Sequence, residues 1–212
     1  DYLFSRAFQL MVETGSLRVL DILANASAVI AEGEVLQLTA ASNIATPEAT
    51  YLQVIRGKTA ALFAAAAEVG GVIAGAPADW IAALNTYGDA LGISFQITDD
   101  LLDYGGLSGA LGKNTGDDFR ERKMTLPVIR AVAVASPEER DFWTRTIGKG
   151  DQRDGDLATA LALMDRHETL ASTRQTALEH AARARTALAP LPAGEMRETP
   201  AELAGFVVSR IA

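Results

Sequence analysis

Hydrophobic positions recur every three or four residues along most of the chain, which is the spacing of one face of an α-helix. At the start, Leu3, Ala7 and Leu10 fall on one side of such a helix. Clusters of Gly, Pro, Asn and Ser interrupt the pattern at intervals, as expected between helices. The pattern predicts an opening helix that ends before Gly15, followed by helices over 17–42, 47–75, 77–104, 157–168, 172–189 and 196–212.

Two local signals predict further helix starts in the second half of the chain. Ser136 is followed three residues later by Glu139, which is the spacing of a capping box. Thr125 precedes Leu126 and Pro127, and proline favours the first turn of a helix. Residues 105–122 contain five glycines and mixed charges, so they are expected to form one long loop, and long loops are often functional.

Composition favours packed helices over sheets. Apolar residues make up 49% of the 212 residues, alanine is abundant and aromatic residues reach only 6%, which together indicate an all-α fold in a single domain. The net charge of −8 argues against nucleic acid as the main partner, because phosphate backbones need a basic surface. No cysteine is present, which fits a reducing compartment.

Membrane insertion is not expected from the sequence. The most apolar stretch, 59–76, contains Glu68 and three glycines, so it is expected to be a buried helix and not a membrane span. We therefore expect a cytoplasmic protein. The chain begins at Asp1 without an initiator methionine and already in a helical pattern, so we expect that a preceding part of the protein is missing.

An acidic run lies inside the helix predicted over 77–104. In a helix, Asp99 and Asp103 lie about 40° apart with a rise of roughly 6 Å, and Gln96, Asp99, Asp100 and Asp103 share an arc of roughly 100°. Mg²⁺ takes oxygen ligands and is commonly shared between a few carboxylates and substrate phosphates. The arc therefore predicts a magnesium site, whereas a solvated acidic face is the ordinary alternative.

A lysine falls within the apolar stripe of the helix predicted over 47–75. Helical spacing places Lys58 among Tyr51, Val54 and Leu62. A buried ammonium needs an anionic partner, so Lys58 is expected to meet a carboxylate or a phosphate. The alternative is that its long side chain reaches water past its neighbours. Thr59 beside it can donate a hydroxyl group.

Lys113 and Lys123 flank a segment dense in charge that follows the acidic helix. Each by itself reads as a solvated surface lysine. Together they can fold back over a metal-bound polyphosphate, because Gly112 and Gly116 permit close approach of the backbone.

These motifs, taken in order, resemble those of the trans-isoprenyl diphosphate synthase family. The resemblance rests on Lys58-Thr59, on the run FQITDDLLD at 95–103, and on Gly112-Lys113 followed by GDDFRERKMTLP at 116–127. It also covers Glu32-Gly33-Glu34 and Gln37. The form of the last motif is similar to the long-chain polyprenyl branch, of octaprenyl to decaprenyl type.

The resemblance implies an all-α bundle of the isoprenoid-synthase type around a central cavity, usually a homodimer. Such an enzyme joins an allylic diphosphate, such as farnesyl diphosphate, to isopentenyl diphosphate with the help of Mg²⁺. The product is a long all-trans polyprenyl diphosphate, of the kind used for quinone side chains. Because that product is strongly apolar, transient contact with a membrane is expected at release.

The resemblance also implies roles for individual residues. Asp99 would bind magnesium directly, and Asp100 and Asp103 would do so directly or through waters. The allylic diphosphate would be held by Lys58, Lys113 and Lys123. Gln96 and Thr59 would lie near the reacting carbon atoms, where a polar group steadies positive charge, and Asp118 would orient the lysines or bind metal.

The sequence departs from the family pattern in one respect. A synthase carries a first aspartate-rich motif on an earlier helix, with nearby basic residues for isopentenyl diphosphate, and neither occurs in residues 1–212. We therefore expect these residues to be the C-terminal two-thirds of one helical domain and to be inactive alone. A noncatalytic subunit of a heteromeric synthase, a helical terpene cyclase and an unrelated bundle remain alternatives.

Overall fold

The computed structural model describes residues 2–105 and 115–211. Within these ranges the chain forms helices and no strand, so the all-α prediction is confirmed. The helices are α1 (Tyr2–Glu13), α2 (Leu17–Ala40), α3 (Glu48–Ile55), α4 (Ala61–Ile73), α5 (Ala78–Tyr104), α6 (Asp117–Arg120), α7 (Leu126–Val134), α8 (Pro137–Trp143), α9 (Asp156–Arg166), α10 (Thr169–Ala187) and α11 (Glu195–Ser209). Two π-helical turns, η1 (Arg56–Ala60) and η3 (Thr144–Gly148), join α3 to α4 and follow α8.

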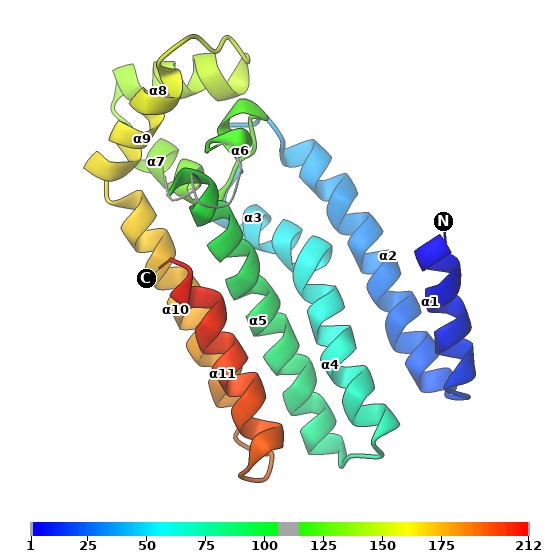
Figure 1. Ribbon diagram of the computed structural model, residues 1–212. Helices are drawn as coiled ribbons and strands as arrows, with labels where there is room; N and C mark the ends of the chain where they lie inside the picture. The colour runs from blue at the N-terminus through cyan, green and yellow to red at the C-terminus, as the bar shows by residue number, and fades with distance from the viewer. Residues whose placement is uncertain (1, 106–114, 212) are drawn as a thin grey trace.

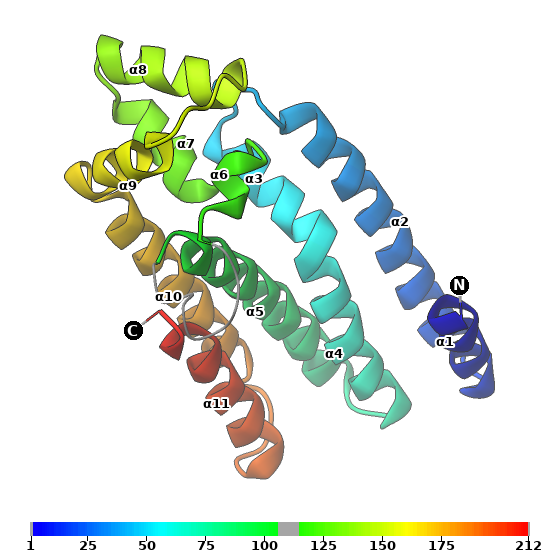
Figure 2. The ribbon, with the colours of Figure 1, turned by 45° about the horizontal axis from the view of Figure 1, so that its top comes forward.

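The long helices run side by side, and the short ones gather at one end. Helix α5 packs between α4 and α10, α11 lies against α10 and α5, and α2 runs along α4 and η1 (Figure 1). Helix α1 folds back on the far end of α2, while α6 to α9 form a cap over the opposite end of the bundle (Figure 2). The acidic run of α5 ends beneath this cap.

Side-chain caps fix two helix starts, and one of them was predicted from the sequence. Ser16 accepts a hydrogen bond from the backbone N–H of Val19 at the start of α2, at 3.3 Å. The predicted capping box of α8 is present, with the Ser136 N–H donating to the Glu139 carboxylate at 3.0 Å. That carboxylate also lies 2.9 Å from both Arg166 and His167, so it ties α8 to the end of α9.

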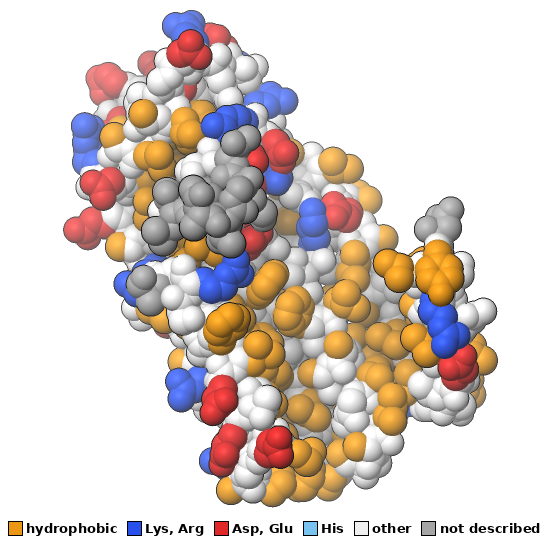
Figure 3. Space-filling view, viewed as in Figure 1, with side chains coloured by type: hydrophobic (Ala, Val, Ile, Leu, Met, Phe, Trp, Pro, Cys, Tyr) orange, Lys and Arg blue, Asp and Glu red, His pale blue; other side chains and the backbone are white. Residues whose placement is uncertain are grey.

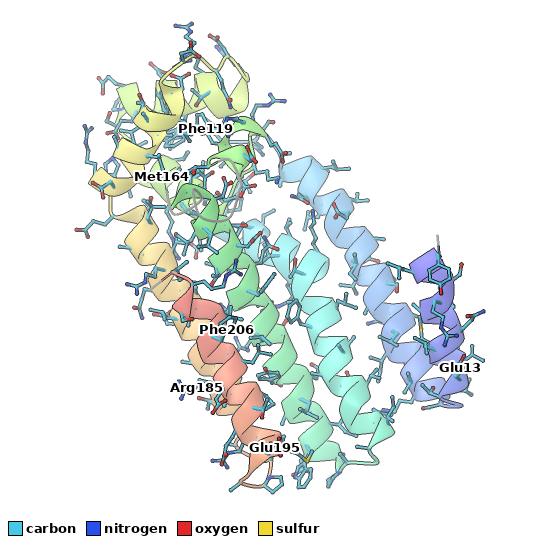
Figure 4. The ribbon with its side chains drawn as sticks, in the orientation of Figure 1. Glu13, Phe119, Met164, Arg185, Glu195 and Phe206 are labelled. Carbon is cyan, nitrogen blue, oxygen red and sulfur yellow. The ribbon has the colours of Figure 1, made fainter. Side chains whose placement is uncertain are left out.

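Two hydrophobic clusters support the bundle. The larger one lies under the cap and includes the fully buried Phe119, Trp143 and Met164 (Figure 4). The smaller one fills the space between α5, α10 and α11 around Tyr87 and Leu188. Helix α5 contributes to both clusters, so it is the central element of the fold.

Glycines let the central helices approach so closely that their backbones touch. A methyl group added at Gly88 of α5 would lie 2.4 Å from the Phe63 carbonyl oxygen, and one at Gly92 would lie 2.5 Å from the Ala60 Cα atom. A methyl group at Gly33 of α2 would lie 2.9 Å from the Gly57 carbonyl carbon. Because these contacts involve backbone atoms, they leave no freedom to slide or rotate the helices.

The structure corrects three expectations. Residues 105–122 were expected to be a single loop, but Asp117–Arg120 form the short helix α6, and 106–114 lie outside the described residues. The helix expected over 47–75 is interrupted by the π-turn η1. The stretch 59–76 was expected to be a buried helix, but α4 is only partly buried, with Leu62 and Ile73 exposed by 50% and 61%. None of the helices in the described ranges combines the length and apolar character needed to span a bilayer.

We predict that Gly88→Ala lowers the free energy of unfolding by about 1–3 kcal/mol, because the new methyl group collides with backbone that cannot move away. Denaturant unfolding of the two proteins measures the difference. Gly70→Ala in α4 is the matched control, since its added methyl group meets nothing within 4 Å. The control should gain up to about 1 kcal/mol from helix propensity. Equal stability of the two variants would contradict the proposed backbone contact.

Candidate functional site

A cavity of about 140 Å³ opens between α2, α3 with η1, α5, and the segment that follows α6. Its wall includes most of the residues that the sequence singles out. The lining residues with polar side chains are Gln37, Thr46, Tyr51, Lys58, Thr59, Gln96, Asp99, Asp100, Asp118, Lys123 and Thr125. The cavity lies where the acidic arc of α5 faces the π-turn η1.

The three aspartates of the acidic run have different surroundings. Asp99 lines the cavity, is partly exposed and forms no hydrogen bond or ion pair with any described residue. Asp100 lines the cavity but is only 6% exposed. Asp103 is not part of the cavity wall. The structure therefore brings Asp99 and Asp100 together with the lysines and separates Asp103 from them.

Both carboxylate oxygens of Asp100 have protein partners. The Tyr51 hydroxyl donates to one oxygen at 2.7 Å, and the Gln96 amide donates to the other at 2.9 Å. Burial raises the pKa of Asp100 to about 7, and the two donors act against this by stabilising the ionised form. Burial also raises the pKa of the Tyr51 phenol well above its usual range, with Asp100 acting in the same direction. The phenol therefore remains a donor at neutral pH.

Asp103 links the end of α5 to α6. Its carboxylate accepts the backbone N–H groups of Asp117 at 3.2 Å and Asp118 at 3.0 Å, and its backbone carbonyl accepts from Gly116 at 2.8 Å. Burial raises the pKa of Asp103, while these N–H donors lower it. In this arrangement Asp103 positions the segment that carries Asp118 and Lys123.

Lys58 lies in the cavity wall, but the expectation that it is buried is wrong. Its side chain is 39% exposed, and its ammonium group pairs with Glu34 at 3.1 Å and donates to Gln37 at 2.7 Å. The reason is the π-turn over Arg56–Ala60, which holds an extra residue and rotates Lys58 away from the stripe that a regular helix would give. The expectation of an anionic partner is met by Glu34 of α2.

The second lysine cluster is only partly within the described residues. Lys123 pairs with Asp118 at 2.9 Å and with Glu121 at 2.8 Å. Burial lowers the pKa of the Lys123 ammonium, but its hydrogen bonds to the two carboxylates outweigh this and hold the pKa above its usual range. Asp118 thus orients Lys123, one of the two roles expected for it. Lys113 and Gly112 lie outside the described residues.

Thr59 and Gln96 are in direct contact. The Thr59 hydroxyl donates to the Gln96 side-chain oxygen at 2.9 Å, and both residues line the cavity. The sequence analysis used Tyr51 only to locate the apolar stripe of its helix and did not identify it as a site residue. The sequence does contain one signal for Tyr51, because it lies seven residues before Lys58, on the same face of the predicted helix. A tyrosine buried there needs an acceptor for its hydroxyl group.

The donor set has room for a divalent cation on one carboxylate but does not form a complete cage. Among the described residues, no three His, Asp or Glu side chains converge closely enough to enclose a metal ion. Asp99 lines the cavity, and neither of its carboxylate oxygens has a partner within residues 2–105 and 115–211. This fits Mg²⁺, which commonly takes one or two protein carboxylates and completes its octahedron with waters and substrate oxygens.

The fold and the cavity define a helical bundle that sets one open carboxylate and two lysines around a polar cavity beside apolar helix faces. Comparison with known proteins agrees with this class. The sequence profile described as Polyprenyl synthetase matches residues 1–164. The octaprenyl diphosphate synthase of Escherichia coli (strain K12) is 42% identical over 210 residues, which are 99% of this chain and 65% of that protein.

Solved structures give the same result. A decaprenyl diphosphate synthase from Rhodobacter capsulatus matches with a TM-score of 0.94 and 65% identity, over 100% of this chain and 65% of the other. A polyprenyl synthase from Caulobacter crescentus CB15, complexed with calcium and isoprenyl diphosphate, matches with a TM-score of 0.94 and 50% identity over the same shares. The chain therefore belongs to the polyprenyl synthetase family, and it spans about 65% of the length of these relatives.

Proposed function

We propose that this chain is part of a long-chain trans-polyprenyl diphosphate synthase. The reaction is the Mg²⁺-dependent condensation of isopentenyl diphosphate with an allylic diphosphate such as farnesyl diphosphate, giving a long all-trans polyprenyl diphosphate of the kind used in quinone side chains. The observation that carries the proposal is the open Asp99 carboxylate in one cavity with Lys58 and Lys123. The octaprenyl and decaprenyl names of the relatives support the long-chain branch.

The charged residues of the cavity bind the allylic diphosphate. Bound Mg²⁺ supplies positive charge that stabilises the departing diphosphate. Asp99 would hold the metal, and Asp103 would contribute through bridging waters or by fixing the start of α6, which carries Asp118. Lys58 and Lys123, with Lys113, hold the phosphate oxygens by charge-assisted hydrogen bonds. Calcium in the Caulobacter crescentus complex supports a divalent cation in this family.

Gln96 and Thr59 lie where the allylic carbon becomes positive after the diphosphate leaves. The Gln96 oxygen accepts the Thr59 hydroxyl with one lone pair and keeps a second lone pair that can face the carbon atom. An oriented dipole of this kind stabilises developing charge without reorganisation during the reaction. The isopentenyl double bond then attacks the carbocation, and the proton lost from the new chain goes to the released diphosphate.

The growing chain needs an apolar surface next to the diphosphate site. Hydrophobic side chains gather on the face over α4, α5 and α11 (Figure 3). Exposed large apolar residues on these elements and on α2 include Val35, Leu38, Leu62, Ile73, Met196, Leu203 and Phe206. We assign this face to the wall of the prenyl chamber, to be closed by family residues that residues 1–212 do not contain. The 212 residues alone are accordingly expected to be inactive.

We expect that the complete protein that carries this chain forms long prenyl products from farnesyl diphosphate, isopentenyl diphosphate and Mg²⁺, measured by chromatography. Asp99→Asn should lower the rate about 100-fold or more, because it removes the open carboxylate. The matched control is Asp89→Asn, also on α5, whose side chain pairs with Arg56 away from the cavity. No product from well-folded protein would favour a noncatalytic subunit of a heteromeric synthase.

A second copy of the chain is the proposed partner at α1. Among the described residues of this helix none is buried, and it exposes 79% of Tyr2, 80% of Leu3 and 67% of Phe4 at its start, while Leu17, at the start of α2 beyond the other end of α1, is 84% exposed. Large exposed apolar side chains along one element are typical of interaction sites. A homodimer that pairs these surfaces would bury them.

We expect Leu3→Glu/Leu17→Glu to shift the complete protein from two copies toward one, as measured by light scattering after size-exclusion chromatography. Burial of a charge in an apolar interface is strongly unfavourable, which is the reason for the shift. Val134→Glu, at a 58% exposed valine at the end of α7, is the control and should leave the mass unchanged. An unaltered dimer in the double variant would place the interface elsewhere.

The substrates are water-soluble diphosphates, so we place the reaction in the cytoplasm. Contact with a membrane is expected to be transient and limited to release of the apolar product. The net charge of −8 is unsuited to nucleic acid, and none is proposed as a partner.

A further inference from the structure

A continuous chain of hydrogen bonds crosses the floor of the cavity from α3 to η1 through α5. The Tyr51 hydroxyl donates to Asp100 at 2.7 Å, the Gln96 amide donates to the other Asp100 oxygen at 2.9 Å, and the Thr59 hydroxyl donates to Gln96 at 2.9 Å. Tyr51 and Asp100 are 5% and 6% exposed, so water does not compete effectively for these bonds. The chain joins α5 to the consecutive elements α3 and η1, across sequence separations of 49 and 37 residues.

The direction of the chain fixes the orientation of the Gln96 amide. The Gln96 nitrogen faces Asp100, whose other oxygen accepts from Tyr51, and the Gln96 oxygen faces the Thr59 hydroxyl. The reverse orientation would place an oxygen against an oxygen. Because Tyr51 occupies the second Asp100 oxygen, the carboxylate cannot turn away from Gln96.

The two adjacent aspartates therefore differ in what they have left to offer a ligand. Asp99 lines the cavity with neither oxygen paired to any residue that the structure describes, whereas each Asp100 oxygen already accepts from a protein donor. A cation could reach Asp100 only through the remaining lone pair of an oxygen that a protein donor already holds in place, in a residue that is only 6% exposed. The environment thus separates a carboxylate that can take a metal ion from one that orients a neighbour.

We infer that Tyr51 is a positioning residue of the condensation reaction, which acts by anchoring Asp100 so that Asp100 orients the Gln96 amide toward the reacting carbon and does not serve as a metal ligand. The inference rests on the proposed synthase function. Tyr51 contacts neither substrate nor metal in this role. Its effect belongs to the transition state, where the Gln96 dipole meets developing positive charge.

The expected signature is a change in kcat at nearly constant KM. In the complete protein, Tyr51→Phe should lower kcat about 10- to 100-fold, the usual effect of losing a residue that orients a site group. The KM values for farnesyl and isopentenyl diphosphate should stay within about twofold, since the groups that bind diphosphate are untouched. An unchanged kcat, or a rise in KM that accounts for the loss, would overturn the inference.

Tyr87→Phe is the matched control. Tyr87 is also buried, in the smaller hydrophobic cluster, and its hydroxyl donates to the Pro200 carbonyl at 3.0 Å. The substitution removes a comparable buried hydroxyl without touching the cavity, so kcat should stay at the level of the unmodified protein. If both phenylalanine variants lose the same activity, the effect is one of general stability and the inference fails.

A second pair of variants tests the role of Asp100 without measuring turnover. Mn²⁺ bound to the complete protein in the presence of inorganic diphosphate is counted by electron paramagnetic resonance. Asp99→Asn should lose one bound ion, whereas the isosteric Asp100→Asn should keep the number of the unmodified protein. Loss of an ion in Asp100→Asn would show that Asp100 is a ligand and overturn the inference.

The same comparison separates this inference from the proposed function. If the unmodified protein makes no prenyl product, the proposed function fails, while the Mn²⁺ counts still distinguish the two aspartates. If product forms and Asp100→Asn keeps full kcat, the function stands and the positioning role fails. Because asparagine matches aspartate in shape, this variant also serves if Tyr51→Phe does not fold.

Discussion

The close backbone contact between α5 and its neighbours is the constraint on which the site depends. Gly88 and Gly92 bring α5 against Phe63, Ala64 and Ala60, where a single methyl group would collide with backbone atoms. A helix held in this way can neither rotate nor slide. Its polar arc therefore points at η1 and α2, and its apolar arc enters both hydrophobic clusters. The position of Asp99 in the cavity follows from packing that lies about two to three helical turns before it in α5.

Adjacent positions on this fixed helix give two carboxylates with opposite properties. A rotation of about 100° carries Asp99 into the open cavity and Asp100 against α3. Desolvation raises the pKa of Asp100 to about 7, whereas its two donors stabilise the ionised form. A buried carboxylate with both oxygens satisfied is a rigid scaffold for a polar network. The neighbouring carboxylate keeps its oxygens for a ligand.

The sequence was sufficient for the helices, the capping box at Ser136 and the acidic arc of α5, because each depends on spacing within one element. The prediction that Lys58 is buried failed, because the π-turn η1 adds a residue, whereas a helical wheel assumes regular α-helical geometry. The sequence did not separate Asp103 from the cavity, because its partners are backbone N–H groups of α6. Tyr51 was missed for a related reason: its acceptor is 49 residues away. Contacts between elements are set by packing, which periodicity does not encode.

The pairing of the cavity lysines explains why such a site needs a metal. Lys58 already faces Glu34, and Lys123 already faces Asp118 and Glu121, so neither ammonium offers an uncompensated positive charge. A diphosphate entering a chain with a net charge of −8 would meet these carboxylates as repulsive neighbours. Under the proposed function, a divalent cation on Asp99 would reverse that balance locally, and the lysines could then share their hydrogen bonds with phosphate oxygens. Anion binding would thus be coupled to cation binding, because both lysines already have carboxylate partners.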